Sequence, residues 1–155
     1  MLKFIQEDKR NEKVNLLYLN QEFGIPENVY IIGMMNTADR GLAMIDYALR
    51  RRFAFYEMKP AFNSEKFKQI IIGSCERTSK LLSVIDDLNK VITDDDALGA
   101  GFQIGHSYFC KDRPLSELDL EVIVKYEIIP LISEYWFDES SKLEEWSDKL
   151  RGALA

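Results

Sequence analysis

The chain has 155 residues, of which 46% are hydrophobic and 30% charged, a composition typical of one globular domain or two small subdomains. Its formal net charge of −6 argues against a broad surface that follows nucleic-acid phosphates. One histidine and two widely separated cysteines argue against a zinc site or any other metal site. The two cysteines are expected to be reduced thiols of a cytoplasmic protein. The apolar runs are too short to cross a membrane.

Residues 1–60 predict an α/β segment. The apolar residues at 14–18 are typical of a short strand, and the run 29–35, apolar on both faces, predicts a strand buried in a parallel sheet. A helix is expected at 40–51, where apolar residues recur at helical spacing, and an aromatic-rich strand at 53–58. The order strand, strand, helix, strand is typical of the edge of an α/β sheet.

Residues 61–155 predict a small all-helical bundle, because the apolar spacing changes to that of helices. Two glycines and a run of three aspartates, residues 94–96, interrupt the helical pattern and predict a solvated loop. The expected helices are centred on residues 67–71, on residues 81–92, from a cap at Ser116 to residue 128, on residues 131–137 with Pro130 in the first turn, and on a last segment that ends at Gly152.

Two short motifs lie close together in the first part of the chain. MNTADR at residues 35–40 is followed by ALRRRF at residues 48–53. This combination resembles the McrB family, the AAA+ GTPase subunits of bacterial restriction systems that cut methylated DNA. The segment 101–109, GFQIGHSYF, is similar to the lid motif of that family, and residues 128–138 are similar to its C-terminal helices.

The resemblance covers nearly the whole chain and implies the C-terminal portion of an AAA+ P-loop NTPase module. Residues 1–60 would then be the edge of its α/β core, with the first-sensor and arginine-finger motifs, and residues 61–155 its helical lid subdomain. It also implies a homo-oligomeric ring, a separate nuclease subunit, and DNA contacts made by regions outside this chain.

The sequence lacks two motifs that such motors need. It contains no GxxxxGK(S/T) loop, which cradles phosphates, and no apolar strand that ends in Asp-Glu, which holds Mg²⁺. We therefore expect GTP, or ATP, and Mg²⁺ to bind in a longer complete protein and not tightly to this chain alone. The alternative is a truncated, non-catalytic module that joins such a ring and regulates it.

The resemblance places catalytic residues at the two motifs. Asn36 is similar to the first sensor, whose carboxamide can contact the γ-phosphate and hold the attacking water; the alternative is a turn asparagine that bonds its own backbone. Asp39 is expected to cap the next helix or to support the site through Arg40. Arg51 and Arg52 are expected to act as arginine fingers in the neighbouring subunit's site. Cations are also favourable at a helix C-terminus by roughly 0.3–1 kcal/mol, and this alternative fits Arg50 best.

The lid motif supplies the predicted nucleotide-binding residues. Many AAA+ lids carry a sensor arginine, but none occurs between Arg77 and Arg113. The expected contacts are therefore Gln103, His106 and Ser107. The alternative for His106 is a structural role, which is the commoner one for a single histidine among aromatic residues. The aromatic residues at 135–137 and 146 are expected to pack the lid or a subunit contact.

Overall fold

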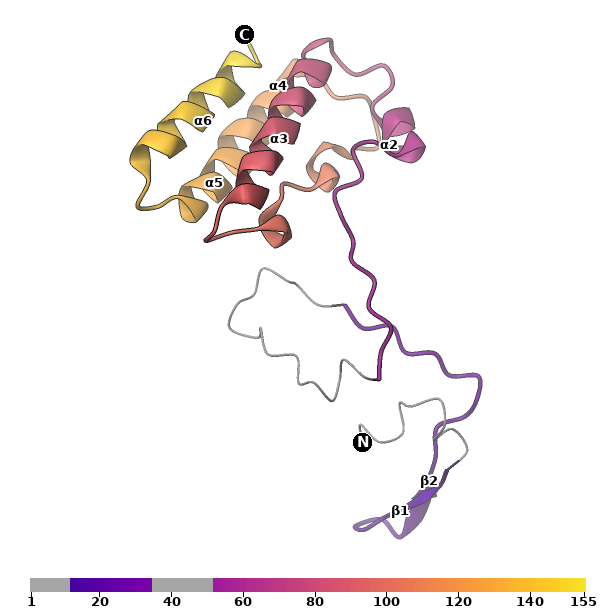
Figure 1. The fold of residues 1–155 in the computed structure, drawn as a ribbon. Coiled ribbons are helices and arrows are strands. Elements are labelled where there is room, and N and C mark those ends of the chain that lie inside the picture. Colours follow the sequence, from indigo (N-terminus) through magenta and orange to yellow (C-terminus); the bar gives the residue numbers. More distant parts are fainter. Residues whose placement is uncertain (1–11, 35–51) are drawn as a thin grey trace. The chain divides into compact units, whose positions relative to one another are not determined.

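The computed structural model describes residues 12–34 and 52–155 (Figure 1). The chain divides into two units between Glu57 and Met58. The predicted helix at 40–51 lies outside the described residues, as do Asn36, Asp39 and Arg51. In the part of the chain that is described, no helix is long and apolar enough to span a bilayer.

A β-hairpin is the regular structure described in the N-terminal unit. Strand β1, Val14–Leu16, pairs antiparallel with β2, Gln21–Phe23, so that Val14 lies opposite Phe23. The turn between them contains Asn20 at a φ of 47°, a left-handed conformation that asparagine tolerates better than most residues. The sequence predicted β1 but not β2, because Gln-Glu-Phe has little intrinsic strand preference and gains its strand geometry from the pairing.

Two strand predictions are wrong where the structure describes the chain. Residues 29–34 and 53–58 have no regular structure, and apolar side chains there are exposed, with Ile32 at 91% and Met34 at 96%. An apolar run forms a buried strand only where neighbouring strands supply hydrogen bonds and cover both faces. Within the described residues the only strand pairing is that of β1 with β2, so the predicted parallel sheet edge is not seen there.

The prediction of an all-helical second unit is confirmed (Figure 1). Helices α3 and α5 both pack against α6, and α3 also packs against the loop that follows it. The elements are α2 (Glu65–Ile70), α3 (Arg77–Asp94), α4 (Glu117–Val122), α5 (Ile129–Tyr135) and α6 (Ser140–Gly152), with short 3-10 helices η4 (Ala100–Phe102) and η5 (His106–Phe109) and a π-helical segment η6 (Ile123–Ile128).

Helix α3 is the central apolar element of this unit. Leu81, Ile85, Leu88 and Ile92 are fully buried and recur every three or four residues, which places them on one face. Burial of each such side chain contributes about 1.5–3 kcal/mol relative to exposure. The sequence predicted this face correctly because a long helix with one apolar stripe has a strong periodic signal.

The predicted helix from Ser116 to residue 128 has a different geometry from the one expected. Ser116 caps it, as predicted, and its hydroxyl accepts the backbone N–H of Asp119 at 3.2 Å. After Val122, however, the chain continues as the π-helical segment η6, and α5 begins two residues earlier than expected. Pro130 has no N–H to donate, and its ring would collide with the carbonyl of Tyr126 in a regular α-helix, which a wider turn avoids.

The expectation of a solvated loop at residues 94–96 is wrong for Asp95. Its side chain is only 8% exposed, and its Oδ2 accepts hydrogen bonds from Lys142 Nζ at 2.6 Å and Trp136 Nε1 at 3.1 Å. Its Oδ1 accepts the N–H of Ala97 at 2.9 Å. The carboxylate therefore ties the loop after α3 to the end of α5 and the start of α6. Asp94 and Asp96 are exposed, as expected.

The Asp95 contacts predict a stability loss on neutralisation. Replacing Asp95 with Asn removes the negative charge of the oxygen that accepts hydrogen bonds from Lys142 and Trp136. Hydrogen bonds to charged groups contribute about 1.5–3 kcal/mol to the free energy of unfolding. We expect the free energy of unfolding in urea to fall by about that amount. The matched control is Asp94→Asn, the same change at an exposed neighbour, which should have little effect. Equal effects of the two substitutions would contradict the assignment.

The same carboxylate predicts a pH dependence of stability. The hydrogen bond from Lys142 lowers the pKa of Asp95 from 3.8 to about 2, although burial acts in the opposite direction. Because the folded-state pKa lies below the ordinary value, the contribution of Asp95 is complete above pH 3.8 and is lost as the pH falls to about 2. Thermal unfolding across this range should therefore show a smaller acid-induced loss in Asp95→Asn than in the unsubstituted chain.

Candidate functional site

The lid motif, residues 101–109, lies between α3 and α4 and combines buried apolar residues with accessible polar ones. Ile104 and Phe109 are fully buried and fix the segment to the core of the helical unit. Gln103 and His106 are half-buried, and Ser107 is exposed. The three predicted nucleotide-binding residues of the lid thus lie on one segment, which the buried side chains of Ile104 and Phe109 attach to the core.

Asn89 holds the backbone of this segment. The residue lies on the buried face of α3 and is 5% exposed. Its Nδ2 donates to the carbonyl of Ile104 at 3.0 Å, and its Oδ1 accepts the N–H of the same residue at 2.6 Å. One carboxamide therefore satisfies both backbone groups of Ile104, as a neighbouring strand would. Sequence reasoning missed Asn89, although a polar residue within an apolar helix face is itself a signal of a buried hydrogen-bond partner.

Thr93, one turn further along α3, fixes the side chain of Gln103. The Thr93 hydroxyl donates to the carbonyl of Asn89 at 2.7 Å, so it must accept the hydrogen bond from Gln103 Nε2 at 2.8 Å. One N–H of the Gln103 amide is therefore used, which leaves its second N–H as a donor and its Oε1 as an acceptor for a ligand. An acceptor oxygen suits a water molecule, a hydroxyl or a base N–H better than a phosphate oxygen.

His106 contacts the start of the helical unit. Its Nδ1 accepts the backbone N–H of Ala61 at 3.1 Å. The ring lies edge-on to Phe67, with centroids 5.8 Å apart, and close to Phe62 at 6.2 Å. These contacts give His106 a structural role, while the assignment of a nucleotide contact stays a prediction.

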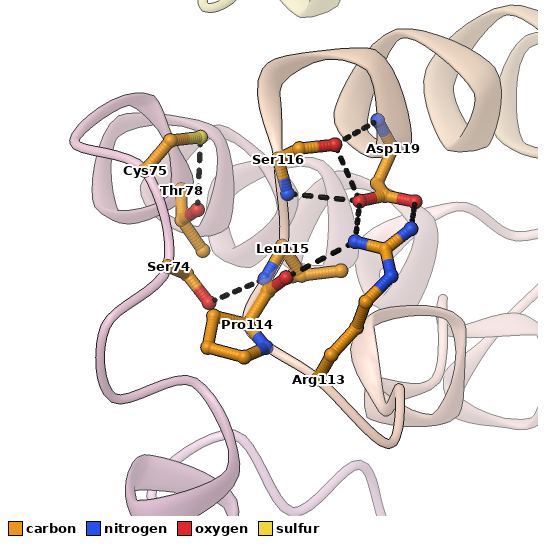
Figure 2. Close-up of polar contacts among 8 residues, drawn as sticks. All are labelled: Ser74, Cys75, Thr78, Arg113, Pro114, Leu115, Ser116 and Asp119. Atoms are coloured by element: carbon orange, nitrogen blue, oxygen red, sulfur yellow. Dashed lines mark hydrogen bonds and ion pairs between the residues drawn. The ribbon is translucent and has the colours of Figure 1, made fainter.

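Arg113 forms an ion pair with the carboxylate of Asp119 (Figure 2). Its two terminal nitrogens donate to Asp119 at 2.6 and 2.8 Å, in the bidentate geometry that guanidinium groups favour. Asp119 also accepts the N–H of Ser116 at 2.9 Å. The Arg113 guanidinium and the Ser116 bonds hold the pKa of Asp119 well below its usual range.

The same cluster joins the loop before α4 to the loop before α3 (Figure 2). The N–H of Leu115 donates to Ser74 Oγ at 3.0 Å, and the N–H of Cys75 donates to the Leu115 carbonyl at 2.9 Å. Arg77, at the start of α3, forms an ion pair with Glu117 at 3.1 Å. Both arginines that flank the lid motif in sequence thus form ion pairs with acidic residues of α4.

The catalytic assignments from the first part of the chain stay predictions. Asn36, Asp39 and Arg51 lie outside the described residues, and Arg52, which is half-buried, belongs to the other unit. Within residues 12–34 and 52–155, no three histidine, cysteine or acidic side chains come together in a group that would hold a metal ion.

Comparison with known proteins places the lid motif in a family. Residues 80–144 match the family model for the alpha-helical lid domain of McrB. Over 98% of its length the chain is 41% identical to the EcoKMcrB subunit of the type IV methyl-directed restriction enzyme of Escherichia coli K12. The chain belongs to the McrB family. It spans 36% of the length of this relative.

The matched lid region contains the polar contacts described above. It includes most of α3 with Asn89, the loop with Asp95, the lid motif, and the helices up to the start of α6. The contacts made by Asn89 and Asp95 are therefore features of an McrB lid domain. The resemblance that the sequence motifs indicated is confirmed.

The Asn89 contacts predict which substitution releases the lid motif. Asn89→Leu leaves the N–H and the carbonyl of the fully buried Ile104 without partners, and each such group costs about 1–3 kcal/mol. We expect the free energy of unfolding in urea to fall by at least about 2 kcal/mol and the Ile104 amide to exchange faster.

The control is Thr93→Val, which removes the hydroxyl's bonds to Gln103 and to the Asn89 carbonyl but leaves the Asn89 carboxamide in place. Because Thr93 lies at the surface, we expect it to change the stability of the chain by less than about 1 kcal/mol and to leave exchange at Ile104 slow. An Ile104 amide that stays protected in Asn89→Leu would show that Asn89 does not hold this segment.

Proposed function

We propose that the chain is part of a GTP-hydrolysing AAA+ motor subunit that drives cleavage of methylated DNA together with a separate nuclease subunit. The observation that carries the proposal is 41% identity over 98% of the chain to a subunit of a methyl-directed restriction enzyme. The identity spans both the motif region and the lid. Residues 1–60 would then belong to the AAA+ core, and residues 61–155 would form its lid.

In this proposal the chain supplies groups that act on phosphates held elsewhere. Other parts of the complete protein, with the phosphate loop and the Asp-Glu pair that this sequence lacks, would hold GTP and Mg²⁺. Asn36 would place the attacking water against the γ-phosphate, with Asp39 supporting the site. Arg51 and Arg52 would enter the neighbouring subunit's site in the ring and stabilise the charge that develops on the transferred phosphoryl group.

The lid motif would contact the same nucleotide. Ser107 is exposed and offers a hydroxyl, while His106 offers a ring nitrogen and Gln103 an amide N–H and an acceptor oxygen. The flanking Arg113 is held by Asp119, so the lid would act through polar, uncharged groups and not through a sensor arginine. The choice of GTP over ATP rests on the family resemblance.

Asn36 is assigned to the site of its own subunit (in cis) and Arg51 to the site of the neighbouring subunit (in trans). These two assignments predict different behaviour in mixed rings. In the full-length protein that contains this chain, Arg51→Ala and Asn36→Ala should each lower the hydrolysis rate, by about 10³–10⁵-fold for a lost arginine finger, while GTP affinity changes little. Each variant is then mixed with a second subunit whose phosphate loop is disabled but whose Arg51 is intact.

Activity should return for Arg51→Ala, because the disabled subunit still donates its finger to the intact site of the variant. It should not return for Asn36→Ala, because neither subunit then has a complete site. Arg50→Ala is the matched control and should hydrolyse GTP normally. Rings of Arg51→Ala that hydrolyse GTP at the normal rate would disprove the finger assignment, and recovery by Asn36→Ala would disprove the cis assignment.

A further inference from the structure

The chain enters the helical unit through a short segment that is fastened to the lid motif. Residues 58–62, the lead-in segment, follow directly after the division between the two units. The N–H of Ala61 donates to Nδ1 of His106, 45 residues away in sequence, at 3.1 Å. The ring of Phe62 adds apolar contact to Phe67 at 5.4 Å and to Phe109 at 6.1 Å.

This hydrogen bond determines where His106 carries its proton. A backbone N–H can only donate, so Nδ1 must present a lone pair, and the neutral ring then carries its hydrogen on Nε2. Among residues 12–34 and 52–155, Nε2 has no hydrogen-bond partner. The two nitrogens of one side chain therefore differ in function: one is used by the fold, and the other is a donor available to a ligand.

We propose that His106 is a positioning residue that joins the lead-in segment to the lid motif through Nδ1 and thereby fixes Nε2–H as a donor to an oxygen of the bound nucleoside triphosphate. The part that concerns the nucleotide rests on the proposed function. The ring would link the nucleotide to the backbone of the lead-in segment. A change in the bound nucleotide would then act on the segment through which the chain enters the lid, and the position of that segment would in turn affect nucleotide binding.

Two substitutions separate the roles of the two nitrogens. The Oδ1 of asparagine reaches the place of Nδ1, so His106→Asn keeps an acceptor for Ala61 but loses the Nε2 donor. The side-chain amide of glutamine reaches the place of Nε2, so His106→Gln keeps a donor there but loses the acceptor for Ala61. Urea unfolding of each variant checks that it is folded.

The first measurement uses the 155-residue chain itself. Long-range ¹H–¹⁵N correlations of the His106 ring should show the hydrogen on Nε2, and the Ala61 amide should be protected from exchange. We expect His106→Asn to keep this protection and His106→Gln to lose it by roughly five- to tenfold, since a single hydrogen bond contributes about 1 kcal/mol. Equal exchange at Ala61 in all three proteins, or a ring with its hydrogen on Nδ1, would overturn the proposal.

The second measurement uses GTP hydrolysis by the full-length protein that contains this chain. His106→Asn should raise KM by roughly tenfold with a smaller change in kcat, because a contact to the nucleotide is lost. His106→Gln should keep KM and lower kcat, because the nucleotide contact is kept but the link to the lead-in segment is broken. Unchanged kinetics in both variants would overturn the nucleotide part. An absence of hydrolysis by the unsubstituted protein would instead contradict the proposed function, and the exchange measurement on Ala61 would still decide the link.

Discussion

The helical unit depends on one constraint: a peptide backbone that passes through an apolar interior must find hydrogen-bond partners there. Ile104 is fully buried, and its N–H and carbonyl are both bonded to the carboxamide of Asn89. Without these two hydrogen bonds the segment could not remain in the core. An unpaired buried peptide group costs about as much free energy as the burial of an apolar side chain gains. The lid motif therefore has its position because Asn89 lies on the buried face of α3.

The remaining loops of this unit follow the same logic with carboxylates in place of the carboxamide. Asp95 accepts from the loop that it belongs to and from the two helices beyond it, and Asp119 accepts from its own helix cap and from Arg113. Each carboxylate accepts hydrogen bonds from several donors, and these bonds connect the loops to the neighbouring helices. A motif between such loops is held in place before any ligand binds, which lowers the entropy cost of recognition.

The sequence was most informative where the signal was periodic or local. The apolar stripe of α3 and the cap at Ser116 were predicted because each depends on residues close together in the chain. The strands at 29–34 and 53–58 were predicted wrongly because a strand depends on partners that its own residues do not specify. At the candidate site, family resemblance selected Gln103, His106 and Ser107, but the contacts of Asn89, Asp95 and Ala61 join residues between 15 and 47 positions apart. Such pairings follow from the tertiary fold, and composition and spacing do not reveal them.

The π-helical segment has a geometric consequence for everything that follows it. The side chains of Leu120, Val124, Ile128, Ile132 and Trp136 are all buried, and they repeat every four residues. In a regular α-helix, such a repeat would turn about 40° around the axis at each step, so its ends would face in nearly opposite directions. The wider turn of η6 cancels much of this rotation and keeps the series in phase with the core. An unbroken α-helix here would rotate Trp136 out of the interior and so remove one of the donors that hold Asp95.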